Sequence, residues 1–143
     1  MYGVLEKQFR LYFAKANSQK GITSQNLMDI LESRLDNMVY RLGFGSSRKM
    51  ARLMVRNKYF TVNGKLINIP SYQVKVNDVI KLVNKYEANG SVLSSMNLTK
   101  QRGVSEWVSF DETSKSGKLL RFPTIEELQL PINLQLIVEL YSK

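Results

Sequence analysis

Four cationic side chains recur at helical spacing in the middle of the chain: Arg48, Lys49, Arg52 and Arg56. At 100° per residue they fall within roughly 100° of one another. Four apolar residues of the same stretch fall on the other side: Met50, Ala51, Met54 and Val55. Arginine can donate two parallel hydrogen bonds to a phosphate and can stack on a base. The pattern therefore predicts a ridge that binds nucleic acid rather than a pocket for a small molecule.

The positive charge of the chain is concentrated around this ridge. The 143 residues include 21 Lys and Arg against 12 Asp and Glu, a net charge of +9. Residues 34–85 contain 11 basic and two acidic residues, whereas the rest contains ten of each. Such segregation favours one surface that meets a polyanion, with the remaining chain as scaffold. A basic domain without a specific partner and a membrane-surface module are the alternatives.

Aromatic residues lie within the basic segment. Tyr59 and Tyr72 could stack on unpaired bases, which is the usual way in which proteins recognise irregular RNA. For Phe60, packing in the core of a small sheet is the favoured interpretation.

The tripeptide from Arg34 to Asp36 also occurs in the active-site motif of pseudouridine synthases. Here it lies within a strongly periodic stretch, where a solvated or capping Asp36 is favoured over a nucleophile. The chain has no Walker-type glycine-rich phosphate loop.

Several classes of chemistry are excluded by composition. The chain has no cysteine and no histidine, so it has no disulfide, thiolate nucleophile, common zinc ligand or imidazole proton shuttle. It has no apolar run of 18 residues that could span a bilayer, and its first seven residues lack the charged and then apolar order of a secretory signal. We expect a soluble, intracellular protein without a metal or cofactor.

The basic segment is predicted to form helix, helix and small sheet. Apolar spacing predicts helices over residues 4–16 and, continuously, over 24–42, where Gly43 ends the second helix. A third helix is expected over 47–57 with Ser46 as its N-cap. The remaining elements are a hairpin of residues 59–62 and 65–67 around Asn63-Gly64, and a strand over 79–83.

The rest of the chain is expected to complete a mostly helical α+β protein. We expect a helix over 91–98, a hairpin of residues 106–110 and 118–122, and a capping box from Thr124 to Glu127. Residues 134–140 fit either a helix or a strand. The expected organisation is a discontinuous, mostly helical body of residues 1–33 and 86–143, with a basic RNA-binding module of residues 34–85 inserted into it.

Four stretches, residues 2–10, 31–43, 62–72 and 135–143, resemble the bacterial family of small-subunit ribosomal protein four. The resemblance runs over nearly the whole chain. It implies a structural, non-enzymatic component of the small ribosomal subunit that is a primary binder of ribosomal RNA. In the family such proteins contact a multi-helix junction in the 5′ domain, nucleate assembly and contribute to translational accuracy.

The same resemblance implies the partners and the location. The expected partners are small-subunit ribosomal RNA and neighbouring ribosomal proteins on the side where messenger RNA enters, with no membrane and no small-molecule substrate. We expect the ribosome of a bacterial cytoplasm, with an organelle matrix as the alternative.

The family pattern and the charge pattern together give the candidate RNA-binding residues. The charge pattern independently selects Arg48, Arg52 and Arg56, and the matches to Lys65, Ser71, Tyr72 and Lys75 are looser. The full set is Lys7, Gln8, Arg10, Arg34, Arg41, Ser47, Arg48, Lys49, Arg52, Arg56, Lys58, Lys65, Ser71, Tyr72 and Lys75.

The chain departs from the family in three places. It begins after the point where the family's basic N-terminal segment, which binds zinc in some members, is expected. The two alternatives are a weaker affinity for RNA and further residues that precede this sequence. Lys58 stands where the family has glycine after the third helix, which should cost stability unless Asn57 takes the left-handed conformation. Val76-Asn77 replaces a Pro-Gly turn.

Two other functions share the predicted module. An RNA-modifying enzyme would need a catalytic domain, and the residues outside 34–85 hold no recognisable catalytic motif. A ribosome-associated stress factor would favour stalled or free subunits over all translating ribosomes.

Overall fold

The structure is a computed structural model that describes residues 6–19, 21 and 23–128. The chain divides into two compact units, one of residues 33–122 and the other of the residues on either side. The predicted ambiguous segment 134–140 lies outside the described residues. No helix in the described part is both long enough and apolar enough to cross a membrane.

The first unit contains α1 (Glu6–Ser18), α2 (Thr23–Glu32) and the short α6 (Ile125–Leu128). In α1 the buried residues are Tyr12 and Ala16, which confirms the predicted apolar face. Nδ2 of Asn26 in α2 donates a hydrogen bond of 3.2 Å to the carbonyl oxygen of Ala16. The two helices therefore pack through both apolar and polar contacts.

The predicted capping box at α6 is confirmed. The backbone N–H of Thr124 donates to Oε1 of Glu127 over 3.0 Å, and the N–H of Glu127 donates to Oγ1 of Thr124 over 3.2 Å. These reciprocal bonds satisfy amide groups that the first turn of a helix leaves without intrahelical partners.

The prediction of one continuous helix over 24–42 is wrong. Helix α2 ends at Glu32, and α3 (Leu35–Leu42) begins after Arg34, whose backbone is extended at φ −60° and ψ 139°. Arg34 forms an isolated antiparallel bridge with Gln73, and the N–H of Leu35 donates to the carbonyl oxygen of Tyr72 over 2.8 Å. These long-range bonds replace helical ones, so a signal based on local apolar spacing could not reveal the break.

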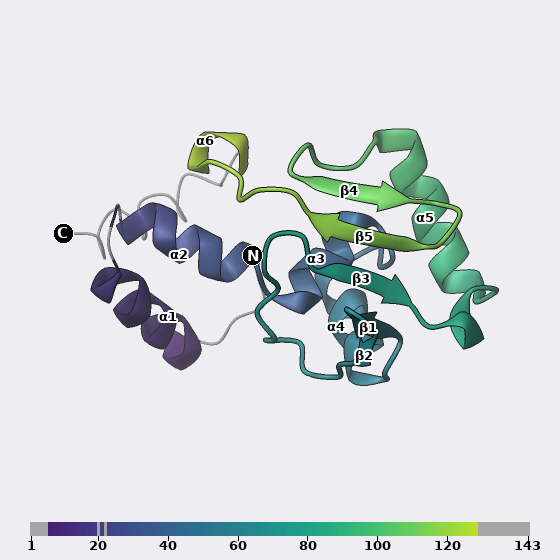
Figure 1. The fold of residues 1–143 in the computed structure, drawn as a ribbon, viewed down its shortest axis with the longest axis horizontal. Coiled ribbons are helices and arrows are strands. Elements are labelled where there is room, and N and C mark those ends of the chain that lie inside the picture. The colour runs from purple at the N-terminus through teal and green to yellow at the C-terminus, as the bar shows by residue number, and fades with distance from the viewer. Residues whose placement is uncertain (1–5, 20, 22, 129–143) are drawn as a thin grey trace. The chain divides into compact units, whose positions relative to one another are not determined.

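The second unit is built on one antiparallel sheet. Its strands are β1 (Phe60–Val62), β2 (Lys65–Leu66), β3 (Val79–Leu82), β4 (Val108–Asp111) and β5 (Ser116–Leu119), in the order β2-β1-β3-β5-β4 (Figure 1). The predicted hairpins and third strand are confirmed, and so is the α+β class.

The sheet extends beyond the predicted module. Val79 of β3 pairs with Lys118 of β5, so strands on both sides of residue 85 share one sheet. Residues 86–122 consequently group with residues 33–85, whereas the sequence had led us to expect them in the helical body.

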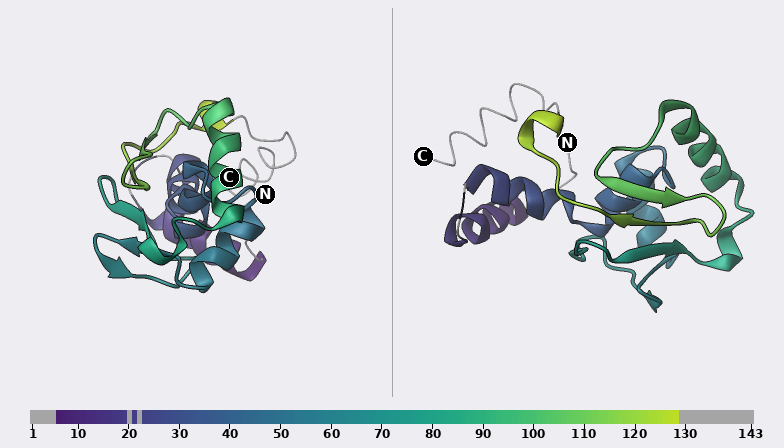
Figure 2. Two further views of the ribbon diagram at one scale, coloured as in Figure 1. Left: turned by 90° about the vertical axis from the view of Figure 1, so that its right-hand side faces the viewer. Right: turned by 45° about the horizontal axis from the view of Figure 1, so that its top comes forward.

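Helices α3, α4 (Arg48–Arg56) and α5 (Gly90–Arg102) pack against one face of this sheet. Helix α5 is longer than predicted and lies beside the β4–β5 hairpin (Figure 2). The Phe44 ring centroid lies 5.1 Å from that of Phe60 and 5.5 Å from that of Phe110. A Cβ on Gly117 would overlap the Leu42 side chain, so α3 lies directly on β5.

Both departures from the family's turn residues adopt left-handed backbone. Lys58 has φ 64°, whereas Asn57 has φ −89°, so the lysine itself takes the conformation that favours glycine. Asn77 has φ 71°, and its N–H donates to the carbonyl oxygen of Leu119 over 2.8 Å. Asparagine tolerates this region better than most residues, so it is a suitable replacement for glycine at this turn.

Candidate nucleic-acid interface

Helix α4 divides into an apolar face and a cationic face, as its sequence predicts. Its N-cap is Ser47 rather than the predicted Ser46, and the Ser47 Oγ accepts a hydrogen bond of 3.1 Å from the N–H of Met50. Ala51, Met54 and Val55 are buried. Burial of this face fixes the rotation of the helix and thereby directs the opposite face outward.

The cationic face of α4 consists of Arg48, Lys49, Arg52 and Arg56. Lys49 and Arg56 are exposed, and Arg48 and Arg52 are half-buried. Neither Lys49 nor Arg56 forms an ion pair with another described residue. Their charge is therefore available to an external anion.

Helix α3 holds the first arginine of this face in place. Nε of Arg48 donates to Oδ1 of Asn37 over 3.3 Å, and its guanidinium carbon lies 4.5 Å from the centroid of the Tyr40 ring. The guanidinium of Arg41 lies 6.0 Å from the same ring and 5.4 Å from the ring of Trp107. Cation–π contacts of this kind orient a guanidinium without neutralising it.

The loop between β2 and β3 is fixed at the first turn of α3. The N–H of Asp36 donates to the carbonyl oxygen of Pro70 over 3.1 Å. Because the neighbouring Asn37 binds Arg48, the loop, α3 and α4 meet at this turn. Ser71 is exposed there and Tyr72 is half-buried. Both predicted residues thus lie close to the start of the cationic face.

Three other predicted cations lie on turns and edges. Lys58 follows α4, Lys65 lies on the edge strand β2, and Lys75 precedes β3. All three are exposed, and none forms an ion pair with a described residue.

The structure places Arg34 away from the surface. The residue is 3% exposed. Its Nε and one terminal nitrogen donate to the two carboxylate oxygens of Asp36 over 3.1 and 3.0 Å. Oδ1 of Asp36 also accepts a bond of 2.7 Å from the N–H of Asn37. This arrangement holds the start of α3, and the carboxylate is neither solvated nor a nucleophile in a cleft.

The remaining predicted residues, Lys7, Gln8 and Arg10, lie on α1 in the first unit. Lys7 and Arg10 are exposed and Gln8 is half-buried. Arg10 forms an ion pair of 2.8 Å with Glu6 one turn earlier. An exposed pair of this kind contributes little to stability and is readily exchanged for another anion.

Two of the aromatic residues have clear packing roles. Phe60 is fully buried, which confirms the prediction that it packs in the core of the sheet. Tyr59 stacks on Tyr86 with ring centroids 3.8 Å apart and an interplanar angle of 7°, so one of its faces is already covered. Sequence reasoning missed Tyr86 and Trp107, whose contacts with Tyr59 and Arg41 join segments far apart in the chain, and Tyr40, whose contact with Arg48 joins two successive helices.

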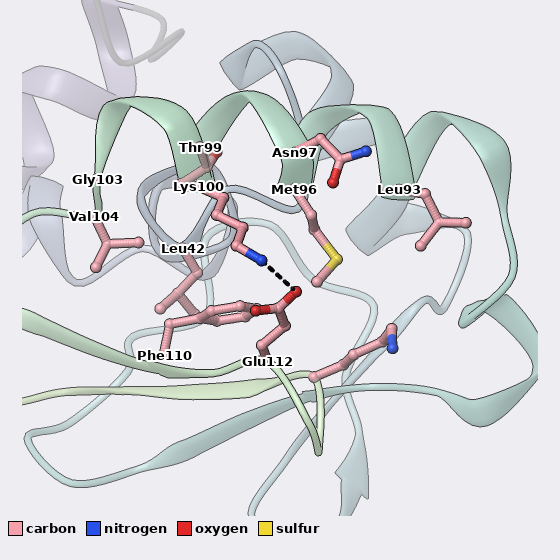
Figure 3. A pocket seen from close by; sticks show the side chains of 11 residues that line it. Leu42, Leu93, Met96, Asn97, Thr99, Lys100, Gly103, Val104, Phe110 and Glu112 are labelled. Atoms are coloured by element: carbon pink, nitrogen blue, oxygen red, sulfur yellow. Dashed lines mark ion pairs between the residues drawn. The ribbon is translucent and has the colours of Figure 1, made fainter.

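A largely apolar pocket of about 270 Å³ lies elsewhere in the second unit, between α5 and the β4–β5 hairpin (Figure 3). Leu93, Met96 and Phe110 line it, and Nζ of Lys100 lies 3.5 Å from Oε1 of Glu112 at its mouth. Lys100 and Glu112 are both exposed, and none of the four α4 cations lines this pocket.

Comparison with known families gives the same boundary between residues 32 and 33 as the structure does. Residues 33–80 match the S4 domain, and residues 1–32 match the ribosomal protein S4/S9 N-terminal domain. A small ribosomal subunit protein uS4 from Syntrophus aciditrophicus is 50% identical over all 143 residues, which cover 68% of that protein. This chain belongs to the uS4 family.

Other uS4 proteins show comparable similarity. The uS4 protein of Solidesulfovibrio magneticus is 50% identical and that of Geobacter sulfurreducens 46% identical, each over the full chain and 69% of the relative. The S4 domain match covers α3, α4, β1, β2 and the start of β3, and so includes α4, which carries the cationic face.

Proposed function

We propose that this uS4 family member is a structural component of the small ribosomal subunit and binds ribosomal RNA through the cationic face of α4. The observation that carries the proposal is the division of α4: Ala51, Met54 and Val55 enter the core, whereas Lys49 and Arg56 are exposed and Arg48 and Arg52 are half-buried on the cationic face. The names of the relatives and the match to the S4 domain support the same role.

The proposed mechanism is positioning. Arg48 and Arg41 are oriented by aromatic rings before RNA arrives, so less side-chain entropy is lost when they bind phosphate. The proposed RNA site is a multi-helix junction of the 5′ domain, where binding would nucleate assembly. The RNA-binding set extends to Lys58, Lys65, Ser71, Tyr72 and Lys75 and, on α1, to Lys7, Gln8 and Arg10.

The proposal includes no catalytic step. Incubation of the chain with ribosomal RNA, followed by nucleoside analysis, tests this directly, because a new modified nucleoside would favour an RNA-modifying enzyme. We further propose that the chain works in the ribosomes of a bacterial cytoplasm, beside proteins near the side where messenger RNA enters. Crosslinking in cells, with identification of the attached proteins, tests these partners.

The central test is binding to the 5′ domain of small-subunit ribosomal RNA at several salt concentrations. Replacing Arg48, Arg52 and Arg56 with Gln should weaken binding by at least about tenfold and reduce the slope of log K against log salt by about 2–3. The slope change follows from three contacts of roughly 0.7–0.9 each.

A matched control removes the same charge elsewhere. Lys81, Lys85 and Lys118 are replaced with Gln. Lys81 and Lys118 lie on the face of the sheet opposite the buried Ile80 and Leu82, and Lys85 lies in the short helix η1 (Asn84–Tyr86). Equal weakening by both triple variants would mean that net charge alone matters, and an unaffected α4 variant with intact circular dichroism would contradict the proposed face.

A further inference from the structure

A second, smaller pocket of about 150 Å³ lies where the C-terminal ends of α3 and α5 meet. Arg41, Arg102, Thr99 and Ser105 line it together with Tyr40, and no carboxylate side chain of the described residues does. We propose that this pocket binds a backbone phosphate of the RNA, with Arg41 and Arg102 as its two cationic ligands. The inference rests on the proposed function and adds Arg102 and Ser105 to the interface.

Close packing of two helices creates the pocket. Gly43 ends α3 with φ 91°, and its N–H donates to the carbonyl oxygen of Tyr40 over 3.0 Å. A Cβ at Gly43 would overlap the side chain of Thr99, so the glycine allows α5 to lie directly against the end of α3. This contact brings Arg102 to the same hollow as Arg41, although the two residues are far apart in sequence.

The electrostatics of the pocket favour an anion. The ring of Trp107 holds the guanidinium of Arg41 at 5.4 Å. Arg102 is exposed and forms no hydrogen bond or ion pair with another described residue. Two arginines and, among the described residues, no carboxylate line this hollow, so an anion between the two guanidinium groups is attracted by both. The hydroxyl of Ser105 supplies a further polar group beside it, whereas Oγ1 of Thr99 already donates to the carbonyl oxygen of Ser95 over 3.0 Å.

The pocket is continuous with the cationic face of α4. The guanidinium carbon of Arg48 lies 4.5 Å from the centroid of the Tyr40 ring, and that of Arg41 lies 6.0 Å from it. The same ring therefore contacts one arginine of the cationic face and one arginine of the pocket. A single RNA strand that contacts α4 can therefore continue to the end of α5.

The test measures RNA affinity and its salt dependence for Arg102→Gln in the full chain. The expected result is a loss of about 3- to 10-fold in affinity and a decrease of roughly 0.7–0.9 in the log–log salt slope. Arg102→Lys should keep the slope but lose part of the affinity, because lysine cannot make the bidentate contact. Lys100→Gln is the matched control, since Lys100 is an exposed cation on the same helix that lines the other pocket.

The outcomes separate this inference from the proposed function. An unchanged Arg102→Gln variant, or equal losses for Arg102→Gln and Lys100→Gln, would overturn the phosphate pocket even if the α4 triple variant lost affinity. If neither the Arg102→Gln variant nor the α4 triple variant loses affinity, both proposals are overturned. Because Arg102 also lies in the last turn of α5, where a cation stabilises the helix, melting temperatures of all variants are measured in parallel. A loss of affinity that follows unfolding, and is absent below the melting transition, would assign Arg102 to helix stability alone and overturn the pocket.

Discussion

Replacing Arg34 with Met should lower the free energy of unfolding of the second unit by about 3–5 kcal/mol. The guanidinium and the Asp36 carboxylate are 3% and 5% exposed and are joined by two hydrogen bonds. Loss of the arginine leaves a buried carboxylate without its countercharge. Removing one partner of a buried ion pair typically lowers the free energy of unfolding by about 3–5 kcal/mol. Since a unit of this size has a total stability of roughly 5–13 kcal/mol, the variant should lose a large part of it.

Urea denaturation followed by tryptophan fluorescence measures this effect. The chain has one tryptophan, Trp107, and it is buried in the second unit. With an m value of about 1.3 kcal/mol/M, the midpoint should fall by roughly 2–4 M. Arg56→Met, which removes an exposed arginine from the same unit, should change stability by less than about 0.5 kcal/mol.

A double variant tests the physical reason. Arg34→Met combined with Asp36→Asn removes the uncompensated charge and should recover part of the loss, because the amide oxygen can still accept from the N–H of Asn37. A single-variant loss below about 1 kcal/mol, or a double variant less stable than Arg34→Met, would refute the assignment of Arg34 to a buried structural pair.

Three further predictions concern stability. Lys58→Gly should raise the free energy of unfolding in urea by about 0.5–1 kcal/mol, because glycine adopts φ 64° without steric cost; a decrease would contradict this. Burial raises the pKa of Asp29 above its ordinary 3.8, although a hydrogen bond from Gln25 acts in the opposite direction. The folded state therefore disfavours the charged form of Asp29, so the Asp29→Asn variant should melt at a higher temperature than the parent near pH 7. This difference in melting temperature should shrink as the pH falls through the pKa of Asp29 in the folded protein towards 3.8. Tyr86→Ala should cost at least about 0.5–1.5 kcal/mol through loss of the stack on Tyr59, whereas Tyr86→Phe should retain most of the stability in the same urea titration.

Local patterns predicted the elements of this fold well. The two faces of α4, the Asn63-Gly64 turn and the Thr124 capping box each depend on residues within a few positions of one another, and all three were confirmed. The break between α2 and α3 was not predictable in this way. It depends on hydrogen bonds to the segment around Gln73, about forty residues later, while the apolar spacing continues across the break.

The candidate site shows the same limit. Charge and spacing selected the outward face of α4, but they also selected Arg34, because no local signal reveals that its guanidinium turns to Asp36. The pocket of Arg41 and Arg102 depends on the contact between Gly43 and Thr99 across two helices. A pattern within one element cannot show such a contact.

The pairing of β5 with β3 has a consequence for synthesis of the chain. Once Leu82 has emerged from the ribosome, β3 can pair with β1, but its other edge has no partner until residues 116–119 have also emerged. At roughly 5–20 residues per second, this interval lasts about 2–7 s, during which the newly made strand presents bare backbone amides and carbonyls. The nascent protein is thus most exposed to mispairing with other chains after its cationic helix has been synthesised and before its sheet can close.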